Sequence, residues 1–261
     1  MKLFDIFKSK KNREMTPQEY YEYIIKEDQK KLYSFEEKYA NQEDKLLNMC
    51  GKVNEYNKNI KMIVISDTHN SLIEEEFKKF MYEHNDYDVC LLLGDHNFND
   101  ITVILKYIDK DKIYGLLGNH DHSYLDEFNI RNLNGNIINI NGTTILGIEG
   151  SFKYKPVKFP SFTQRDSIIF LNDIPSVDIL VSHDGGFDSK MVNNPAHQGL
   201  FGITYYLFKN KVPYHIHGHL HNSYRKELLN GTKEISTYMY EYIELKDGEI
   251  WLHLMNLWKL I

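Results

Sequence analysis

Aspartate, histidine and asparagine recur in short polar blocks along the chain, and each block directly follows an apolar run. In chain order the five blocks are Asp67-Thr68-His69, Gly94-Asp95, Gly118-Asn119-His120-Asp121, a single His183, and Gly218-His219-Leu220-His221. The side chains of Asp, His and Asn are ligands for divalent ions of hard to borderline character, such as Mn²⁺, Fe²⁺ or Zn²⁺. The blocks therefore predict a site whose chemistry depends on metal ions.

Seven side chains of these blocks are candidate metal ligands. They are Asp67, His69, Asp95, Asn119, His183, His219 and His221. One ion takes about four to six ligands, water included, so a set of this size suits two ions that share a bridging ligand. A lone histidine after a strand is usually an ordinary core or surface residue. It is the order of the five blocks that favours metal binding here.

The apolar runs before the blocks are typical of buried strands. Four of them are Met62–Ser66, Val89–Leu93, Ile113–Leu117 and Ile179–Ser182, and near-continuous apolar runs of this length suit a sheet covered on both faces. A fifth strand, Pro213–Ile216, is expected before the last block. Helical patterns at Leu72–His84 and Asp100–Asp109 separate the first three runs, which predicts a βαβαβ unit and a parallel core. Because open α/β sheets bind ligands beyond the carboxyl ends of their strands, the five blocks should converge.

Turn signals predict three hairpins outside this core. Asn-Gly and Asp-Gly pairs favour tight hairpin turns, and they occur at Asn141-Gly142, Asn230-Gly231 and Asp247-Gly248. The expected strand pairs are Asn136–Ile140 with Thr143–Ile148, Tyr224–Leu229 with Glu234–Tyr238, and Tyr242–Lys246 with Glu249–Leu254. The C-terminal part should therefore be rich in β-structure.

The first 60 residues differ from the rest of the chain and predict a helical N-terminal extension. Thr16 and Pro17 are a helix start, followed by a helix over Glu19–Tyr39 and a weaker one over Gln42–Asn57. We expect residues 61–261 to form the catalytic domain. The extension, 1–60, is a candidate docking arm for a protein partner.

Composition restricts the class of protein further. The chain has 261 residues, a formal net charge of −6 and only two cysteines, Cys50 and Cys90, too few for a disulfide framework. No apolar run approaches the ~18 residues of a membrane span, and no signal peptide is recognisable. We therefore expect a cytoplasmic protein. The acidic balance argues against binding to extended nucleic-acid duplexes.

The five blocks together resemble the calcineurin-like metallophosphoesterases, whose pattern is D-x-H, G-D, G-N-H-D/E, a lone H and G-H-x-H. The resemblance covers roughly Lys61 to Trp251. It implies an α/β fold in which two mixed β-sheets pack as a sandwich flanked by helices. It also implies a metal-dependent phosphoester hydrolase with two divalent ions, Mn²⁺ favoured over Fe²⁺ or Zn²⁺, that activate a hydroxide nucleophile.

The same resemblance implies a role for each site residue. Asp67, His69 and His221 would hold one ion, Asn119, His183 and His219 the other, and Asp95 would bridge them. His120 would be the general acid or a stabiliser of transition-state charge, with Asp121 orienting it. Asn119 and His120 would also contact the substrate phosphate.

Two segments are candidates for substrate selection. Residues 151–165 combine Lys and Arg with interleaved aromatic residues, which suits a nucleotide or single-stranded nucleic acid or, alternatively, packing of the aromatics on the domain. His197, in the loop after His183, is a further candidate substrate contact. We favour a phosphodiesterase on a nucleotide or nucleic-acid substrate. A phosphomonoesterase or phosphoprotein phosphatase, and a non-catalytic metal-binding scaffold, are the alternatives.

Overall fold

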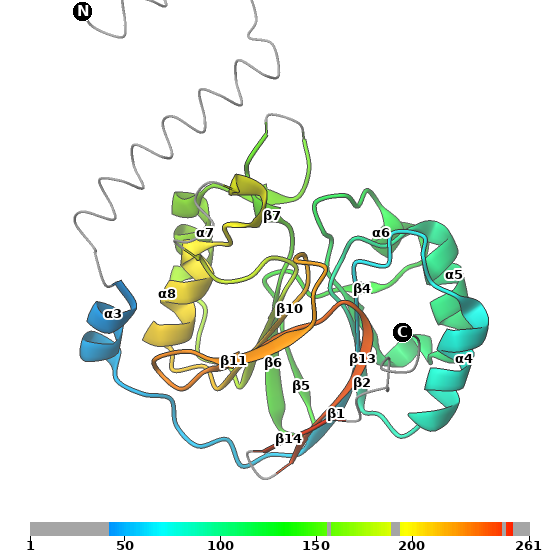
Figure 1. Ribbon diagram of the computed structural model, residues 1–261, viewed down its shortest axis with the longest axis horizontal. Coiled ribbons are helices and arrows are strands. Elements are labelled where there is room, and N and C mark those ends of the chain that lie inside the picture. The colour runs from blue at the N-terminus through cyan, green and yellow to red at the C-terminus, as the bar shows by residue number, and fades with distance from the viewer. Residues whose placement is uncertain (1–41, 156–157, 189–193, 247–248, 253–261) are drawn as a thin grey trace, which may run out of the picture.

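Two six-stranded β-sheets pack face to face, and helices cover the outer face of each sheet (Figure 1). The computed structural model describes residues 42–155, 158–188, 194–246 and 249–252. This arrangement confirms the predicted α/β sandwich of two mixed sheets flanked by helices. Among the described residues, no helix is both long and apolar enough to cross a bilayer.

The first sheet is built on β1 and its neighbours. Its order is β14 (Glu249–Leu252), β13 (Met239–Lys246), β1 (Ile60–Ser66), β2 (Val89–Leu92), β3 (Ile113–Gly115) and β4 (Arg131–Asn132). The strands from β1 to β4 run parallel, whereas β13 is antiparallel to β1. Helices α4 (Glu74–Glu83) and α5 (Phe98–Tyr107) make the predicted crossovers between the parallel strands.

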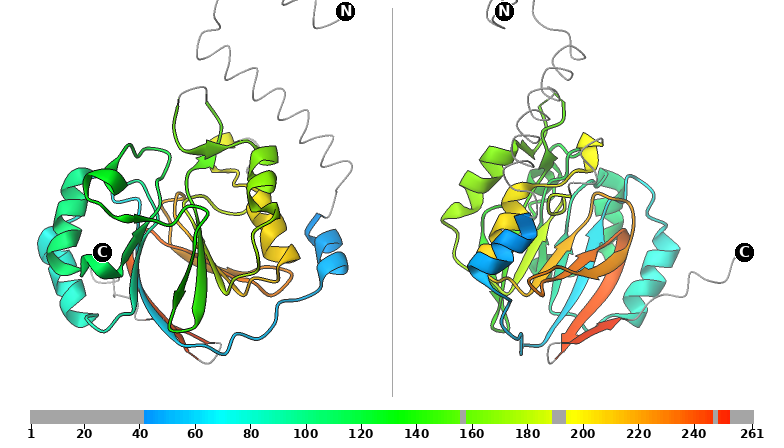
Figure 2. Two further views of the ribbon diagram at one scale, coloured as in Figure 1. Left: turned by 180° about the vertical axis from the view of Figure 1, so that it is seen from behind. Right: turned by 60° about the vertical axis from the view of Figure 1, so that its left-hand side comes forward.

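The second sheet has a parallel centre with an antiparallel hairpin at each edge. Its order is β11 (Tyr224–Glu227), β12 (Lys233–Ser236), β10 (Tyr214–His217), β9 (Ile179–Ser182), β6 (Thr143–Ile148) and β5 (Ile137–Ile140). Helices α3 (Gln42–Cys50), α7 (Gln164–Asn172) and α8 (Phe201–Lys209) lie against its outer face (Figure 2).

Short elements lie in the connections within each sheet. They are the single turns η1 (Lys110–Lys112) and η3 (Pro195–His197), the short helix α6 (Tyr124–Glu127), and the two-stranded ribbon of β7 (Ser151–Phe152) and β8 (Ser161–Phe162). The ribbon and η3 stand above the carboxyl ends of the central strands (Figure 1).

The alternation of side chains along β1 explains why its sequence is apolar throughout. Met62 and Val64 point between the sheets, where they pack with Val181 of β9. Ile63 and Ile65 point to the other face and pack under the helices. A strand buried on both faces needs apolar residues at every position, so the continuous run is what the sandwich requires.

The predicted hairpins form where turn residues allow a left-handed backbone. Asn141 and Gly142 have φ of 52° and 86° between β5 and β6, which pair antiparallel. The second and third predicted pairs also form, as β11 with β12 and β13 with β14. The turn residues 247–248 and the last two residues of the final predicted strand, 253–254, lie outside the described residues.

The second predicted helix is shorter than the sequence suggested. It ends at Cys50, because Gly51 follows with φ of +76°, a left-handed residue that closes a helix. The chain then docks on the domain, with Leu46 buried beside α8 and the Val53 N–H donating to the Asn230 carbonyl oxygen. The predicted helix Glu19–Tyr39 and most of the predicted docking arm lie outside the described residues.

Candidate metal centre

The five polar blocks follow β1, β2, β3, β9 and β10, at the carboxyl ends of the parallel strands in both sheets. Backbone hydrogen bonds join their loops. The Asp67 N–H donates to the Gly94 carbonyl oxygen, and the Gly218 N–H donates to that of His183. The His219 N–H donates to Asp67 Oδ2 at 2.8 Å, which links the two sheets. The structure therefore brings the blocks together as the sequence predicted.

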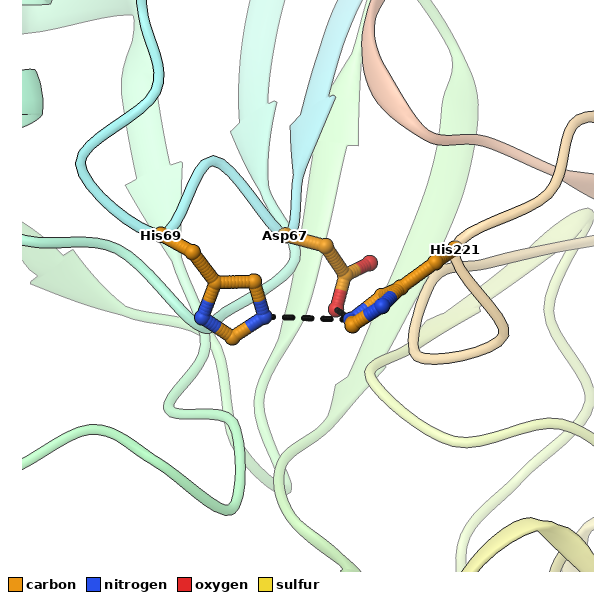
Figure 3. Close-up of side chains that lie close together, drawn as sticks. All are labelled: Asp67, His69 and His221. Carbon is orange, nitrogen blue, oxygen red and sulfur yellow. Dashed lines mark hydrogen bonds and ion pairs between the residues drawn. The ribbon is translucent and has the colours of Figure 1, made fainter.

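One group of ligand atoms comes from Asp67, His69 and His221, all within 4.8 Å of one another. Figure 3 shows the two imidazole rings approaching the Asp67 carboxylate from opposite sides. The Nε2 atoms of His69 and His221 are 3.1 Å apart, and His221 Nε2 lies 3.6 Å from Asp67 Oδ1.

A second group comes from Asp95, His183 and His219, again with ligand atoms within 4.8 Å. Asn119 joins it through Oδ1, which lies 3.0 Å from His183 Nε2. Asp95 Oδ2 is 3.6 Å from His183 Nε2 and also 3.6 Å from His69 Nε2 in the first group. One carboxylate oxygen therefore faces both groups.

Hydrogen bonds to carbonyl oxygens set which imidazole nitrogen faces inward in the second group. His183 Nδ1 is 2.8 Å from the Leu93 carbonyl oxygen, and His219 Nε2 is 2.6 Å from that of Ala196. A carbonyl oxygen only accepts, so each of these nitrogens carries the proton. His183 Nε2 and His219 Nδ1 then present lone pairs to the site, which is the usual arrangement of a metal-ligating histidine.

Two buried carboxylate oxygens test whether the residues fit metal ions. Among the described residues, Asp67 Oδ1 and Asp95 Oδ2 have no hydrogen-bond partner. Buried charged atoms are expensive unless they are paired or coordinate a metal. Both atoms face imidazole nitrogens, and His183 Nε2 faces the Asn119 Oδ1 acceptor. A set of acceptors turned toward one another fits divalent cations.

The pKa shifts show that these carboxylates and imidazoles stabilise opposite charges on one another. Burial opposes ionisation of Asp67, but the nearby His221 and His183 imidazoles and hydrogen bonds from the Ser66 hydroxyl and the His219 N–H hold the pKa of its carboxyl well below its usual range. Burial also opposes ionisation of His183, yet the Asp95 and Asp67 carboxylates raise its pKa. Without metal, a proton on His183 supplies part of the positive charge that the site requires.

His120 lies at the edge of the first group. Its exposed ring stands edge-on to His69, with ring centroids 5.6 Å apart, and its backbone N–H donates to Asp95 Oδ1 at 2.8 Å. Burial lowers the pKa of its imidazole, and the Lys155 ammonium lowers it further. The His120 ring therefore belongs to neither ligand group but lies beside the first of them.

Asp121 contacts the backbone and not the His120 ring that it was expected to orient. Its buried carboxylate accepts hydrogen bonds from the N–H groups of Gly118, Asp95 and His96 at 2.6–2.8 Å. Burial raises the pKa of this carboxyl to about 6, although the three N–H groups oppose the rise. These contacts make Asp121 a positioning residue for the loop that carries Asp95.

Three further residues lie near the two ligand groups, and the sequence alone indicates a role at the site only weakly for each of them. His197 lies with its ring centroid 5.2 Å from that of His219, so this candidate is brought to the site. Tyr154 accepts a hydrogen bond at 3.2 Å from Asn119 Nδ2, and buried Asp184 accepts one at 3.0 Å from the Phe152 N–H. Only the basic and aromatic composition of residues 151–165 hinted at Tyr154.

Five of the ligand residues have a left-handed backbone, where the chain turns sharply out of its strand. They are Asp67, His69, Asp95, His219 and His221, with φ between 43° and 69°. Gly218 meets a related constraint, since a Cβ at this position would lie 1.8 Å from Ser66 Oγ and 2.6 Å from Asp67 Oδ2.

We expect the substitution Gly218→Ala to displace Asp67 and weaken metal binding by the first group. The added methyl overlaps two buried polar atoms, and overpacking of this kind costs about 1–3 kcal/mol of stability. Metal content per chain after desalting, together with the melting temperature, measures the effect. Gly142→Ala is the control for metal content alone: nothing lies within 4 Å of its added Cβ, but its φ of +86° strains an alanine and should lower the melting temperature without loss of metal. Wild-type metal content in Gly218→Ala would contradict the assigned geometry.

The sequence and the fold both resemble those of known proteins. The model of the calcineurin-like phosphoesterase family matches residues 60–223. A Thermus thermophilus crystal structure has a TM-score of 0.52 at 13% identity, covering 74% of this chain and 98% of its own. A Streptococcus pneumoniae protein titled a predicted phosphoesterase has a TM-score of 0.41 at 13% identity, and the match covers 76% of this chain and 97% of that protein. A 5'-nucleotidase precursor from Thermus thermophilus has a TM-score of 0.48 at 13% identity, and the match covers 74% of this chain and 53% of that protein. Among curated proteins, no sequence matches the chain.

Proposed function

Because the chain belongs to the calcineurin-like phosphoesterase family, we propose that it hydrolyses phosphoesters at the centre formed by the two ligand groups. The observation that supports this most is the pair of buried carboxylate oxygens, Asp67 Oδ1 and Asp95 Oδ2, turned toward imidazole nitrogens of both groups. When bound, two divalent ions, here proposed as Mn²⁺, lower the pKa of a shared water and neutralise charge on the phosphoryl oxygens.

Each ligand residue has a proposed place in this reaction. Three would hold the first ion and three the second, and the Asp95 carboxylate, which faces both groups, would serve both ions. The groups are Asp67, His69 and His221 for the first, and Asn119, His183 and His219 for the second. Hydrogen bonds from backbone groups hold the side chains before the substrate arrives, so little reorganisation is needed at the moment of reaction.

His120 is the proposed proton donor to the leaving oxygen. Its ring stands beside His69, outside both ligand groups, and its backbone is fixed to Asp95 Oδ1. This position lets the ring reach an oxygen of a phosphoester held at the centre without displacing a ligand. Asp121 supports the reaction indirectly, by fixing the backbone of the Asp95 loop.

The proposed substrate class is a phosphodiester of a nucleotide or a single-stranded nucleic acid. The charge of Lys155 reaches His120 and lowers its pKa, and Lys155 Nζ lies above the Tyr154 and Phe159 rings, 5.0 Å and 5.4 Å from their centroids. A cation beside aromatic faces suits a ligand that has both phosphates and bases. His197, next to His219, is a further proposed substrate contact.

We expect the purified full chain with Mn²⁺ to cleave bis-p-nitrophenyl phosphate faster than p-nitrophenyl phosphate. Nucleotides, cyclic nucleotides, single-stranded oligonucleotides and phosphopeptides tested in parallel then identify the substrate.

Lys155→Ala should raise KM for the preferred nucleotide substrate roughly two- to fivefold, the effect of one partly solvated charge, with little change in kcat. Lys110→Ala is the control, because η1 precedes β3 at the opposite edge of the sheet.

Faster turnover of phosphopeptides than of nucleotides would instead identify a phosphoprotein phosphatase. Absence of turnover with Mn²⁺, Fe²⁺, Ni²⁺ and Zn²⁺ alike would contradict the hydrolase assignment itself.

A further inference from the structure

A second cluster of metal-ligating side chains lies on the outer face of the second sheet, apart from the two groups described above. His215 and His217 alternate along β10, and Glu234 lies on the neighbouring parallel strand β12, directly opposite His215. Their ligand atoms lie within 4.8 Å of one another. Both histidines are fully buried and Glu234 is 3% exposed.

The hydrogen-bond network assigns the proton of His215 to Nε2. The Ser182 hydroxyl is 2.6 Å from the Asp184 carbonyl oxygen, which only accepts, so the single Ser182 proton is donated there. Ser182 Oγ must therefore accept from His215 Nε2, 2.8 Å away. Nδ1 of a neutral His215 then turns a lone pair toward Glu234 Oε2 at 3.4 Å, and two acceptors face each other.

His217 meets the same carboxylate in the same way. Its Nδ1 is 3.0 Å from the Gly218 carbonyl oxygen and must donate to it. Nε2 therefore presents a lone pair to Glu234 Oε1 at 3.5 Å and to the Tyr224 hydroxyl at 3.2 Å. The Tyr224 hydroxyl, which is 3.0 Å from Glu234 Oε1, has one proton. Because Lys226 Nζ, 2.7 Å away, also donates to Glu234 Oε1, the pair that lacks a donor is His215 Nδ1 and Glu234 Oε2.

Two states relieve this conflict, a second proton on the imidazoles or a metal ion among the three side chains. Both imidazole rings are fully buried, and a buried imidazolium is costly. A metal ion fits better, because histidines that bind metals commonly donate their other ring N–H to a backbone carbonyl or a hydrogen-bonded oxygen, as both do here.

The distances also fit a metal ion. Tetrahedral zinc sites have bonds of about 2.0–2.2 Å, which place neighbouring ligand atoms about 3.3–3.5 Å apart. The contacts of 3.4 Å and 3.5 Å between Glu234 and the two histidines, and of 3.2 Å between His217 and Tyr224, lie close to this spacing. Two imidazoles and a carboxylate are a donor set that zinc accepts.

We propose that His215 Nδ1, His217 Nε2 and the Glu234 carboxylate bind one Zn²⁺ ion at a third site, with the Tyr224 hydroxyl as the fourth neighbour. The ion ties β10 to β12 at the residues that lead directly into the Gly218–His221 turn. Its role is to hold the strand end from which His219 and His221 extend.

Charges around the cluster bear on the affinity of this site. The Lys226 ammonium lies 2.7 Å from Glu234 Oε1, with its side chain 47% exposed, so it competes with a cation for one carboxylate oxygen. Glu43 of α3 feels the charges of both Lys226 and Glu234 and adds negative charge on this side. Removal of Lys226 should thus strengthen zinc binding, whereas removal of Glu234 should abolish it.

The test is zinc stoichiometry of the full chain, stripped with chelator, dialysed against Zn²⁺ and desalted. We expect three ions per wild-type chain and two in Glu234→Gln, with affinity at the third site reduced more than a hundredfold. Lys226→Gln should bind the third ion more tightly. His84→Gln, which changes another buried histidine, at the C-terminal cap of α4, is the control and should keep three.

Two outcomes would overturn the proposal: a folded wild-type chain that binds no more than two ions, or a Glu234→Gln chain that still binds three. If Glu234→Gln does not fold, anomalous diffraction at the zinc edge on the wild-type protein decides. A peak between His215, His217 and Glu234 supports the site, and none there contradicts it. Neither readout depends on catalytic activity, so the third site and the proposed hydrolase function can fail separately.

Discussion

Asp95→Asn is expected to reduce kcat about a thousandfold or more and to lower the metal content of both ligand groups. Asp95 Oδ2 lies 3.6 Å from a histidine nitrogen in each group, and it is buried without a hydrogen-bond partner among the described residues. Asn keeps the shape and the Oδ1 acceptor for the His120 N–H but removes the charge. A thousandfold loss corresponds to about 4 kcal/mol, within the several kcal/mol that a catalytic metal supplies.

Asp178→Asn is the matched control for this experiment. Asp178 accepts hydrogen bonds from the Thr144 N–H and hydroxyl and from Lys58, and Thr144 lies at the opposite end of β6 from the site. The same chemical change there should lower stability and leave the metal content at the wild-type value. If Asp95→Asn retains full metal content and turnover, Asp95 does not bridge the groups.

His120→Ala is expected to keep the metal content of wild type and to lose about 10²–10⁴-fold in kcat, the usual contribution of a positioned acid or base. The ring is not part of either ligand group, so the metals should remain. His122→Ala, which removes an exposed histidine two residues further on, is the control and should be nearly silent.

The leaving group separates the two roles proposed for His120. A proton donor matters most when the leaving oxygen is a poor leaving group. The loss should therefore be larger for an alkyl ester than for a p-nitrophenyl ester. An equal loss for both would indicate that His120 stabilises charge in the transition state without transferring a proton. Loss of metal from His120→Ala would contradict both roles and make His120 a ligand.

The sequence was most informative where local pattern and site coincide. A buried parallel strand is usually apolar throughout, so β1, β2 and β9 could be located, and the polar block after each one marked the edge where the candidate ligands lie. Strand β10, which buries His215 and His217, was indicated by the block that follows it. Asp67, Asp95 and His183 could be assigned together for this reason. Their convergence follows from parallel topology, which the alternation of strands and helices had already indicated.

Other features depend on the path of the loops, which the sequence does not encode locally. Asp121 turns toward the backbone of Asp95 and His96 because the loop after β3 lies against the loop after β2. Glu234 meets His215 only because β10 pairs with β12 in parallel register. Helix α3 ends early at Gly51, the weak point of the predicted helix, because this glycine adopts a left-handed backbone.

The left-handed backbone at five ligand positions links folding to metal supply. Each non-glycine residue in this conformation costs of order 1 kcal/mol, so Asp67, His69, Asp95, His219 and His221 together cost about 5 kcal/mol, comparable to the whole stability of a small domain. Metal ions that bind only the folded chain offset this cost by mass action. The fraction of folded protein should therefore rise with the concentration of free metal, and the chain would respond to metal scarcity by unfolding as well as by losing activity.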